Sequence, residues 1–222
     1  MNRGLKNYTK QLTQTVGNAG TVSVNINKND ANMHIVLPVL KTIGLAPIDL
    51  KLIYNYQDRN VDGLFGKGFK LNFYSKLTSS GNSYTMLNAD GSRDTYVEGQ
   101  TNKETQLVIR GQSDGYDNML GYQIMDRQGN IIEYSTEQTE YPKLIKTATD
   151  SFTLDFIKNY PTIENGRGDL VRFITSGNKV EKVVYSRSEA AILIVELVYD
   201  SNNRLISLVY TDGTGRTSKE YA

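Results

Sequence analysis

The residues best spaced for metal chemistry lie between positions 58 and 63, where the chain reads Asp58-Arg-Asn60-Val-Asp62-Gly63. Oxygen-bearing side chains at alternate positions, followed by glycine, match the first half of a calcium-binding loop. The twelfth position, where a bidentate glutamate should complete the coordination shell, is Phe69. We therefore expect a polar turn here, with calcium binding by Asp58, Asn60 and Asp62 as the alternative.

Histidine-based catalysis would have to use His34, because the chain has no other histidine. This residue begins an apolar segment, and no Gly-x-Ser-x-Gly elbow occurs, so we expect a structural histidine. Acidic pairs such as Glu133 with Glu137, or Glu164 with Asp169, are expected by chance among 24 acidic residues. A glycoside hydrolase, which needs two correctly separated carboxyl groups, is accordingly the third hypothesis for function. We predict no catalytic residue, no resident metal and no cofactor.

Composition excludes several further classes of protein. The chain has no cysteine, which rules out disulfides, thiolate nucleophiles and cysteine-ligated zinc. A formal net charge of +1 gives no basis for nucleic-acid binding. The longest apolar run, residues 190–195, is too short to cross a bilayer. Residues 1–10 carry basic side chains without the apolar run of a secretory signal peptide.

Tyrosine is unusually frequent, with 15 residues against six phenylalanines and no tryptophan. Its ring packs while its hydroxyl reaches solvent, which suits a sheet with half-hydrated faces. A row of such rings can also stack on sugars. A carbohydrate- or cell-surface-binding module is therefore the alternative function, and its candidate ligand-facing residues are Tyr54, Tyr56, Tyr74, Tyr84 and Tyr96.

The elements that must position these residues read as strands. Residues 21–27 alternate polar and apolar side chains, and residues 33–40 form an apolar strand. Pro38 should end or bulge that strand, because proline lacks a backbone donor. The run of β-branched residues within 186–196 favours a strand over a helix. The chain is thus predicted to be all-β.

Turn signals recur along the chain between these alternating segments. Asp-Gly, Gly-Asn and Asn-Asn pairs supply residues that tolerate the positive φ of tight hairpins. Their unequal spacing indicates a degenerate repeat of strand, turn and strand, which predicts antiparallel hairpins stacked into an extended or curling sheet. The expected turn residues are Gly63, Gly66, Gly68, Asp90, Gly91, Gly129, Gly177, Asn203 and Gly213.

The last quarter of the chain carries a recognisable motif. Tyr199-Asp200, followed by Asn203-Arg204-Leu205 and a further strand, resembles the tyrosine-aspartate repeat of RHS proteins. These are the large shell-forming proteins of polymorphic toxins, bacterial walls and teneurins.

An earlier segment is similar to the opening module of the same family. In that module a Leu-x-Leu-x-Tyr-Asn strand is followed by Gly-x-Gly-Trp and another strand. Here residues 48–56 and 63–73 provide these features in order, with Asp90-Gly91 after them, and Phe69 replaces the tryptophan. The resemblance covers about residues 35–222. The self-cleaving core and toxin domain that it would call for are missing from this sequence.

The resemblance implies a non-enzymatic structural segment of a shell or surface assembly, in an extracellular, cell-surface or particle-associated location. Its partners would be protein: another copy or a continuing chain of the same type. The expected division is an N-terminal arm (1–33), an opening β module (34–150) and repeat-like hairpins (151–222). The sequence stops in mid-repeat without a polar cap, so we expect association through sheet edges, with residues 205–210 as the docking edge.

Overall fold

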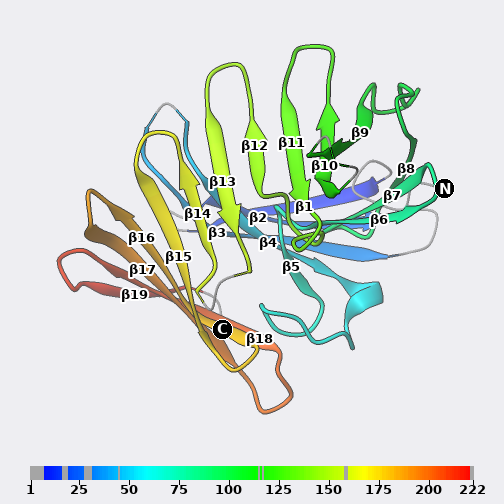
Figure 1. Cartoon of the computed structure of the whole chain (residues 1–222). Helices are drawn as coiled ribbons and strands as arrows, with labels where there is room; N and C mark the ends of the chain where they lie inside the picture. Colours follow the sequence, from blue (N-terminus) through cyan, green and yellow to red (C-terminus); the bar gives the residue numbers. More distant parts are fainter. Residues whose placement is uncertain are drawn as a thin grey trace.

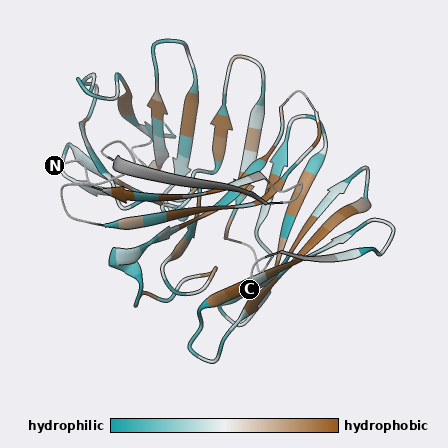
Figure 2. Ribbon diagram, turned by 180° about the vertical axis from the view of Figure 1, so that it is seen from behind, coloured by the Kyte–Doolittle hydropathy of each residue, from teal (hydrophilic) through white to brown (hydrophobic). Residues whose placement is uncertain are grey.

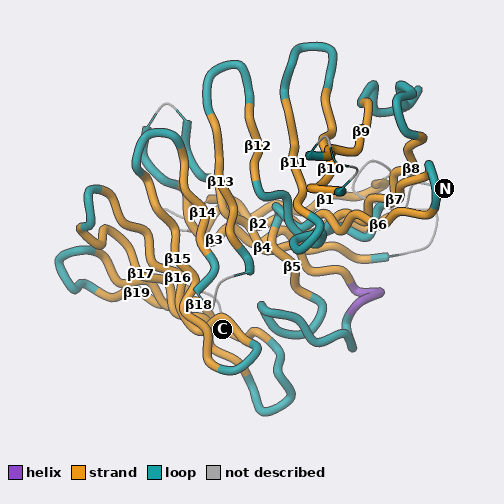
Figure 3. The backbone as a smooth tube through the Cα atoms, viewed as in Figure 1, coloured by secondary structure: helices purple, strands orange, loops and turns teal. Residues whose placement is uncertain are grey.

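The protein is described by a computed structural model, which covers residues 8–16, 20–27, 32–44, 46–114, 116, 118–157 and 160–220. Within these ranges the fold is all-β and antiparallel (Figure 1). The helical element within the described residues is a short 3-10 turn, η2 (Tyr56–Asp58), which is the purple segment of Figure 3. The predicted fold class is therefore confirmed, and the sheets are open rather than closed into a barrel.

A five-stranded sheet contains the first part of the chain. Its strands pair in chain order: β1 (Tyr8–Val16), β2 (Gly20–Asn27), β3 (Met33–Lys41), β4 (Asp49–Asn55) and β5 (Phe69–Leu71). In β3, Pro38 lies beyond the last residue that pairs with β2, which is Val36. The pairing with β4 shifts between Pro38 and Leu40, so the predicted bulge is present. The missing N–H of proline is accommodated at this irregular position.

The remaining strands form two more sheets. The three-stranded sheet consists of β6 (Ser75–Ser80), β7 (Ser83–Asn88) and β8 (Arg93–Val97). The eleven-stranded sheet also follows chain order and consists of β9 (Val108–Ser113), β10 (Met119–Met125), β11 (Ile131–Ser135), β12 (Leu144–Lys146), β13 (Ser151–Asp155), β14 (Thr162–Asn165), β15 (Asp169–Ser176), β16 (Lys179–Arg187), β17 (Ala190–Tyr199), β18 (Leu205–Asp212) and β19 (Thr217–Glu220). Figure 1 shows it curling from β9 to β19.

Two apolar clusters hold the sheets together. The larger one joins β3 and β4 to β13–β18, so the five-stranded sheet packs against the later part of the eleven-stranded sheet. Its fully buried members include Leu50, Leu52, Phe173 and Val195. The smaller cluster joins the three-stranded sheet to β9–β11. Hydrophobic residues accordingly follow the strands in Figure 2, while the connecting loops are mostly hydrophilic.

A five-residue turn recurs along the eleven-stranded sheet and gives the degenerate repeat a physical basis. A side-chain oxygen of its first residue accepts hydrogen bonds from the backbone N–H groups two and four positions later. The first residues of these turns are Asp114, Asp126, Asn165, Asp200 and Asp212. Positive φ is found at the fourth position, in Gly129, Gly168, Asn203 and Gly215. The repeat thus consists of an acceptor, two variable residues, a residue that tolerates positive φ and a fifth residue whose N–H donates to the acceptor.

Most of the expected turn residues lie between consecutive strands. Gly91 has φ +79° and Gly177 has φ +57°, in the β7–β8 and β15–β16 turns respectively. Asp90 precedes Gly91 and accepts a hydrogen bond from the N–H of Ser92. Gly213 also lies in the β18–β19 turn, but the positive φ of that turn belongs to Gly215, which is the fourth residue of the five-residue pattern that begins at Asp212.

The expected module boundaries do not separate one sheet from another. Position 150 lies in the turn between β12 and β13, which are hydrogen-bonded neighbours in one sheet. Position 33 lies at the start of β3, which pairs with β2 of the expected N-terminal arm. The division into three parts stays a prediction about the sequence, whereas the sheets themselves run across both positions.

Candidate interface and the junction that positions it

The two motif-bearing segments of the chain meet in space. We call residues 62–68 the glycine loop and residues 199–204 the Tyr-Asp turn. The backbone N–H of Lys67 donates to the carbonyl of Asn203 at 2.9 Å. The Asn203 Nδ2 donates to Asp62 Oδ1 at 3.3 Å. Next to the turn, the N–H of Val180 donates to the carbonyl of Leu64 at 2.8 Å. This junction therefore ties the loop before β5 to β16 and to the β17–β18 turn.

Two glycines allow this close approach. Gly66 has φ +86°, and a Cβ at this position would lie 2.9 Å from both the Asn203 carbonyl oxygen and a ring carbon of Tyr199. Gly68 has φ +76°, and its Cβ would lie 2.6 Å from the ring of Tyr54. A side chain at either site would meet a backbone conformation and a contact that both favour glycine. Gly63, by contrast, is not among the positive-φ glycines.

A chain of polar side chains links β3 to the end of β4 and to η2, which precede the glycine loop. Asn32 Nδ2 lies 2.8 Å from Asn55 Oδ1 and 3.1 Å from His34 Nε2. Asn55 in turn donates from Nδ2 to Asp58 Oδ2 at 3.1 Å. His34 is fully buried, and its partner Asn32 is also buried. Buried polar groups are expected to be hydrogen-bonded, and this arrangement gives the single histidine a place in a packed polar network.

The three residues of the candidate calcium loop have separate partners. Asp58 Oδ2 forms an ion pair with Lys70 Nζ at 2.6 Å, and Asp62 accepts from Asn203. Asn60 is exposed on the turn after η2. Over the described part of the chain, no group of three or more His, Cys, Asp or Glu residues is arranged to hold a metal ion. A calcium ion at Asp58 would have to compete with the Lys70 ammonium for the same oxygen.

The tyrosines expected to face a ligand do not share a surface. Tyr84 and Tyr96 are only 3% and 1% exposed, so this part of the expectation is wrong. They are register partners on β7 and β8, and both point into the smaller core cluster. Tyr54 packs on Phe69, whereas Tyr56 is 44% exposed. Tyr74 stands apart from these and is partly buried, packed edge-to-face against a buried ring of the larger cluster.

Among the residues of the acidic pairs, Asp169 accepts hydrogen bonds from three side chains. It is 1% exposed and accepts from Arg187 Nε at 2.7 Å and from the Tyr185 hydroxyl at 3.0 Å. Asn165 Nδ2 donates to its other oxygen at 2.9 Å and also to the carbonyl of Ala46 at 3.0 Å. Burial acts to raise the pKa of Asp169, but the hydrogen bonds from Arg187, Asn165 and Tyr185 outweigh it, so the pKa is lowered.

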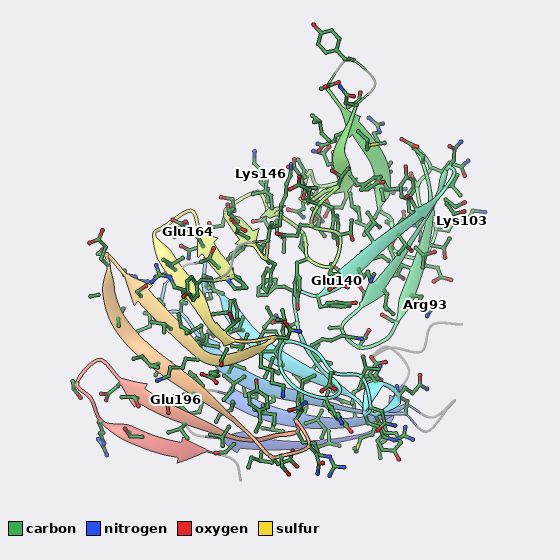
Figure 4. All side chains as sticks on the ribbon, turned by 60° about the horizontal axis from the view of Figure 1, so that its bottom comes forward. Arg93, Lys103, Glu140, Lys146, Glu164 and Glu196 are labelled. Atoms are coloured by element: carbon green, nitrogen blue, oxygen red, sulfur yellow. The ribbon has the colours of Figure 1, made fainter. Side chains whose placement is uncertain are left out.

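The other carboxylates do not converge on a common centre. Glu133 pairs with Lys143 and accepts from Gln123, and Glu164 is exposed on β14. Figure 4 shows charged side chains distributed over different elements, among them Arg93, Lys103, Glu140, Lys146, Glu164 and Glu196. Their separation favours roles on the surface of the sheets.

Several sheet edges are covered by the chain itself. On the outer side of β6, the N–H groups of Ser75 and Leu77 donate to the carbonyls of Glu140 and Thr139 at 3.1 and 2.8 Å. On the outer side of β9, the N–H of Gly111 donates to Glu98 Oε1 at 3.0 Å. Covering of this kind protects unpaired backbone groups from pairing with another chain.

In the part of the chain that the structure describes, β5 and β8 also end their sheets with one partner strand each, and the two terminal strands nearest the ends of the chain are β1 and β19. Within the described ranges, β1 pairs only with β2 and β19 pairs only with β18, so each has one outer edge without a partner strand. β1 has nine residues and β19 has four. Each lies at the end of its sheet order, where another strand can add by the same hydrogen-bonding pattern.

The expected docking edge at residues 205–210 is corrected by this topology. β18 pairs with β17 on one side and, through Leu208 to Thr211, with β19 on the other, so it is an interior strand. The pairing of β18 with β17 is also irregular, because the register shifts opposite Val198 and Tyr199 and leaves Ile206 as the extra residue of a bulge. Ile206 is 47% exposed, whereas Leu208 is fully buried. The edge at this end of the sheet is β19.

Comparison with known proteins adds no assignment: the chain matches no protein-family model, and a search of curated proteins found no match either. No helix in the described ranges is long and apolar enough to cross a membrane.

Proposed function

We propose that this chain is a non-enzymatic structural segment that packs against protein partners through its terminal sheet edges. The proposal includes membership of the RHS type of shell or surface assembly, as the two sequence motifs imply. The observation that carries it is the contrast between edges. β6 and β9 are covered within the chain, whereas β1 and β19 each keep an outer edge without a partner strand in the described ranges.

An open edge carries N–H and C=O groups that need hydrogen-bond partners, either water or another strand. A partner strand from a second copy or from a continuing chain of the same type would extend the eleven-stranded sheet beyond β19. The junction between the glycine loop and the Tyr-Asp turn supports this role, because it holds the β17–β18 hairpin, and β18 is the strand on which β19 pairs.

The test uses two neighbouring proline substitutions in β19, Ser218→Pro and Lys219→Pro. Adjacent residues of a strand direct their N–H groups to opposite sides, so one substitution removes a bond to β18 and the other removes an outward donor. Thermal unfolding identifies which proline is which, because the substitution that removes a hydrogen bond to β18 should lower Tm more than the one that removes an outward donor.

We expect sedimentation velocity to show concentration-dependent association of the unmodified chain. The outward proline should weaken that association while Tm stays close to that of the unmodified chain. A protein that remains monomeric at all concentrations, and whose sedimentation neither proline changes, would contradict packing through this edge between copies.

A further inference from the structure

The side chain of Lys179 ends against the carboxamide of Asn203. Its Nζ contacts Asn203 Oδ1, and the ring of Tyr199 lies beside it, with Nζ 5.5 Å from the ring centroid. Lys179 begins β16, whereas Asn203 lies in the turn between β17 and β18, 24 positions later. Both side chains are partly buried. An amine and a carboxamide from different strands are thus held in direct contact.

Hydrogen bonds hold both the backbone and the side chain of Asn203. Its φ is +65°, its N–H donates to the carbonyl of Asp200 at 3.1 Å, and its own carbonyl accepts from the N–H of Lys67 at 2.9 Å. Its Nδ2 donates to Asp62 Oδ1 at 3.3 Å. The carboxamide therefore lies between an amine at its oxygen and a carboxylate at its nitrogen. Amine, electrophilic carbon and proton carrier come from three separate segments of the chain.

We propose that Lys179 and Asn203 are joined by an intramolecular isopeptide bond. A C=O bond is about 1.2 Å long, so an amine that contacts Oδ1 also lies beside Cγ. Lysine amines act as nucleophiles in their neutral form, with a neighbouring base to accept the proton. Holding both groups in one place makes the reaction effectively unimolecular, which favours attack on an otherwise unreactive amide.

The atoms of this step balance without any other reactant. The neutral Nζ of Lys179 attacks Cγ of Asn203, forming an N–C bond, and the bond from Cγ to Nδ2 breaks. The departing nitrogen leaves as ammonia. Asp62, which is hydrogen-bonded to Nδ2, accepts the proton lost by the attacking amine and delivers it to the leaving nitrogen. No group is oxidised or reduced. The product ties the start of β16 covalently to the Tyr-Asp turn.

Intact mass spectrometry of the purified full chain tests the bond directly. We expect the unmodified sequence to weigh less than its calculated mass by one ammonia molecule. Lys179→Arg keeps the positive charge and should restore the full calculated mass of that variant. Asp62→Asn keeps the size of the side chain and should slow or abolish the loss. After trypsin treatment, the peptide 173–182, still containing uncleaved Lys179, should be joined to the peptide 188–204.

Two further variants separate the chemistry from the fold. Asn203→Asp retains an electrophilic carbon, so its mass should fall by one water molecule instead of one ammonia. Asn203→Gly tolerates the positive φ without a carboxamide and should show no loss. A folded, unmodified chain at its full calculated mass, without the joined peptides, would overturn the proposal and leave Lys179 and Asn203 as a hydrogen-bonded pair.

Discussion

The junction between the glycine loop and the Tyr-Asp turn can be tested by adding one methyl group at Gly66. In Gly66→Ala the new Cβ would lie 2.9 Å from the Asn203 carbonyl oxygen and from the Tyr199 ring. The backbone at φ +86° is also unfavourable for any residue with a Cβ. We therefore expect the substitution to strain the loop and to push it away from the turn.

The size of the effect follows from two separate contributions. Left-handed backbone costs a residue with a Cβ about 1–2 kcal/mol. Displacing the Asn203 carbonyl weakens its hydrogen bond from Lys67, and a net hydrogen bond contributes about 0.5–1.5 kcal/mol. The free energy of unfolding should thus fall by about 1.5–3.5 kcal/mol, as the sum of the two. Urea denaturation measures this as a lower midpoint with an unchanged m-value.

Gly129→Ala is the matched control. Gly129 has nearly the same φ, +83°, but no atom lies within 4 Å of its Cβ position. This variant should lose only the backbone contribution of about 1–2 kcal/mol. The difference between the two variants then isolates the contact with the Tyr-Asp turn. Equal losses in Gly66→Ala and Gly129→Ala would refute the claim that this contact stabilises the junction.

Further predictions concern pH and calcium. The lowered pKa of Asp169 means that its contribution to stability is present above pH 3.8 and is lost as the pH falls below it, so Asp169→Asn should flatten the acid limb of a plot of Tm against pH. Burial is the main cause that raises the pKa of four tyrosines to about 12: Tyr74, Tyr84, Tyr96 and Tyr134. Rapid absorbance titration should therefore find these four hydroxyls un-ionised at pH 10, and the stability of the fold should decrease as the pH rises toward 12. Millimolar calcium should leave Tm unchanged, because Lys70 already neutralises Asp58; a clear rise in Tm that Asp62→Ala removes would contradict this.

Local chemistry made much of the fold predictable. The Asp-Gly pair at Gly91 and the Asn-Asn pair at Asn203 both give positive φ where the strands reverse, because few other residues tolerate that conformation. The β17 strand was also predictable, since its β-branched run disfavours a helix. The Ser188-Glu189 turn was not, although both residues have positive φ. Neither is a typical turn residue, and the pairing of β16 with β17 imposes their conformation.

The errors in the candidate site have a common physical origin. Alternation along a strand shows which residues share a face, but it does not show what covers that face. Tyr84 and Tyr96 were therefore open to a surface role until the packing of β7 and β8 on β9–β11 placed them inside. The same limit applies to edges. The segment from Leu205 to Tyr210 is predicted to be an edge strand when β19 is not recognised in the sequence. The four residues of β19 are polar and lack the apolar alternation that marks a buried strand.

The glycine loop and the Tyr-Asp turn depend on each other, and this explains why both motifs occur in one chain. Gly66 and Gly68 leave the loop without a side chain at its two closest contacts, which is an advantage only if another segment approaches there. The Tyr-Asp turn is that segment, because Asn203 presents its carbonyl to the loop while Asp200 holds the turn in place. The larger core cluster repeats this relation, since Leu52 of β4 and Phe173 of β15 are buried in the same cluster. Residues on either side of position 150 therefore stabilise one another, and β18, the strand with which β19 pairs, belongs to the same cluster through Leu208.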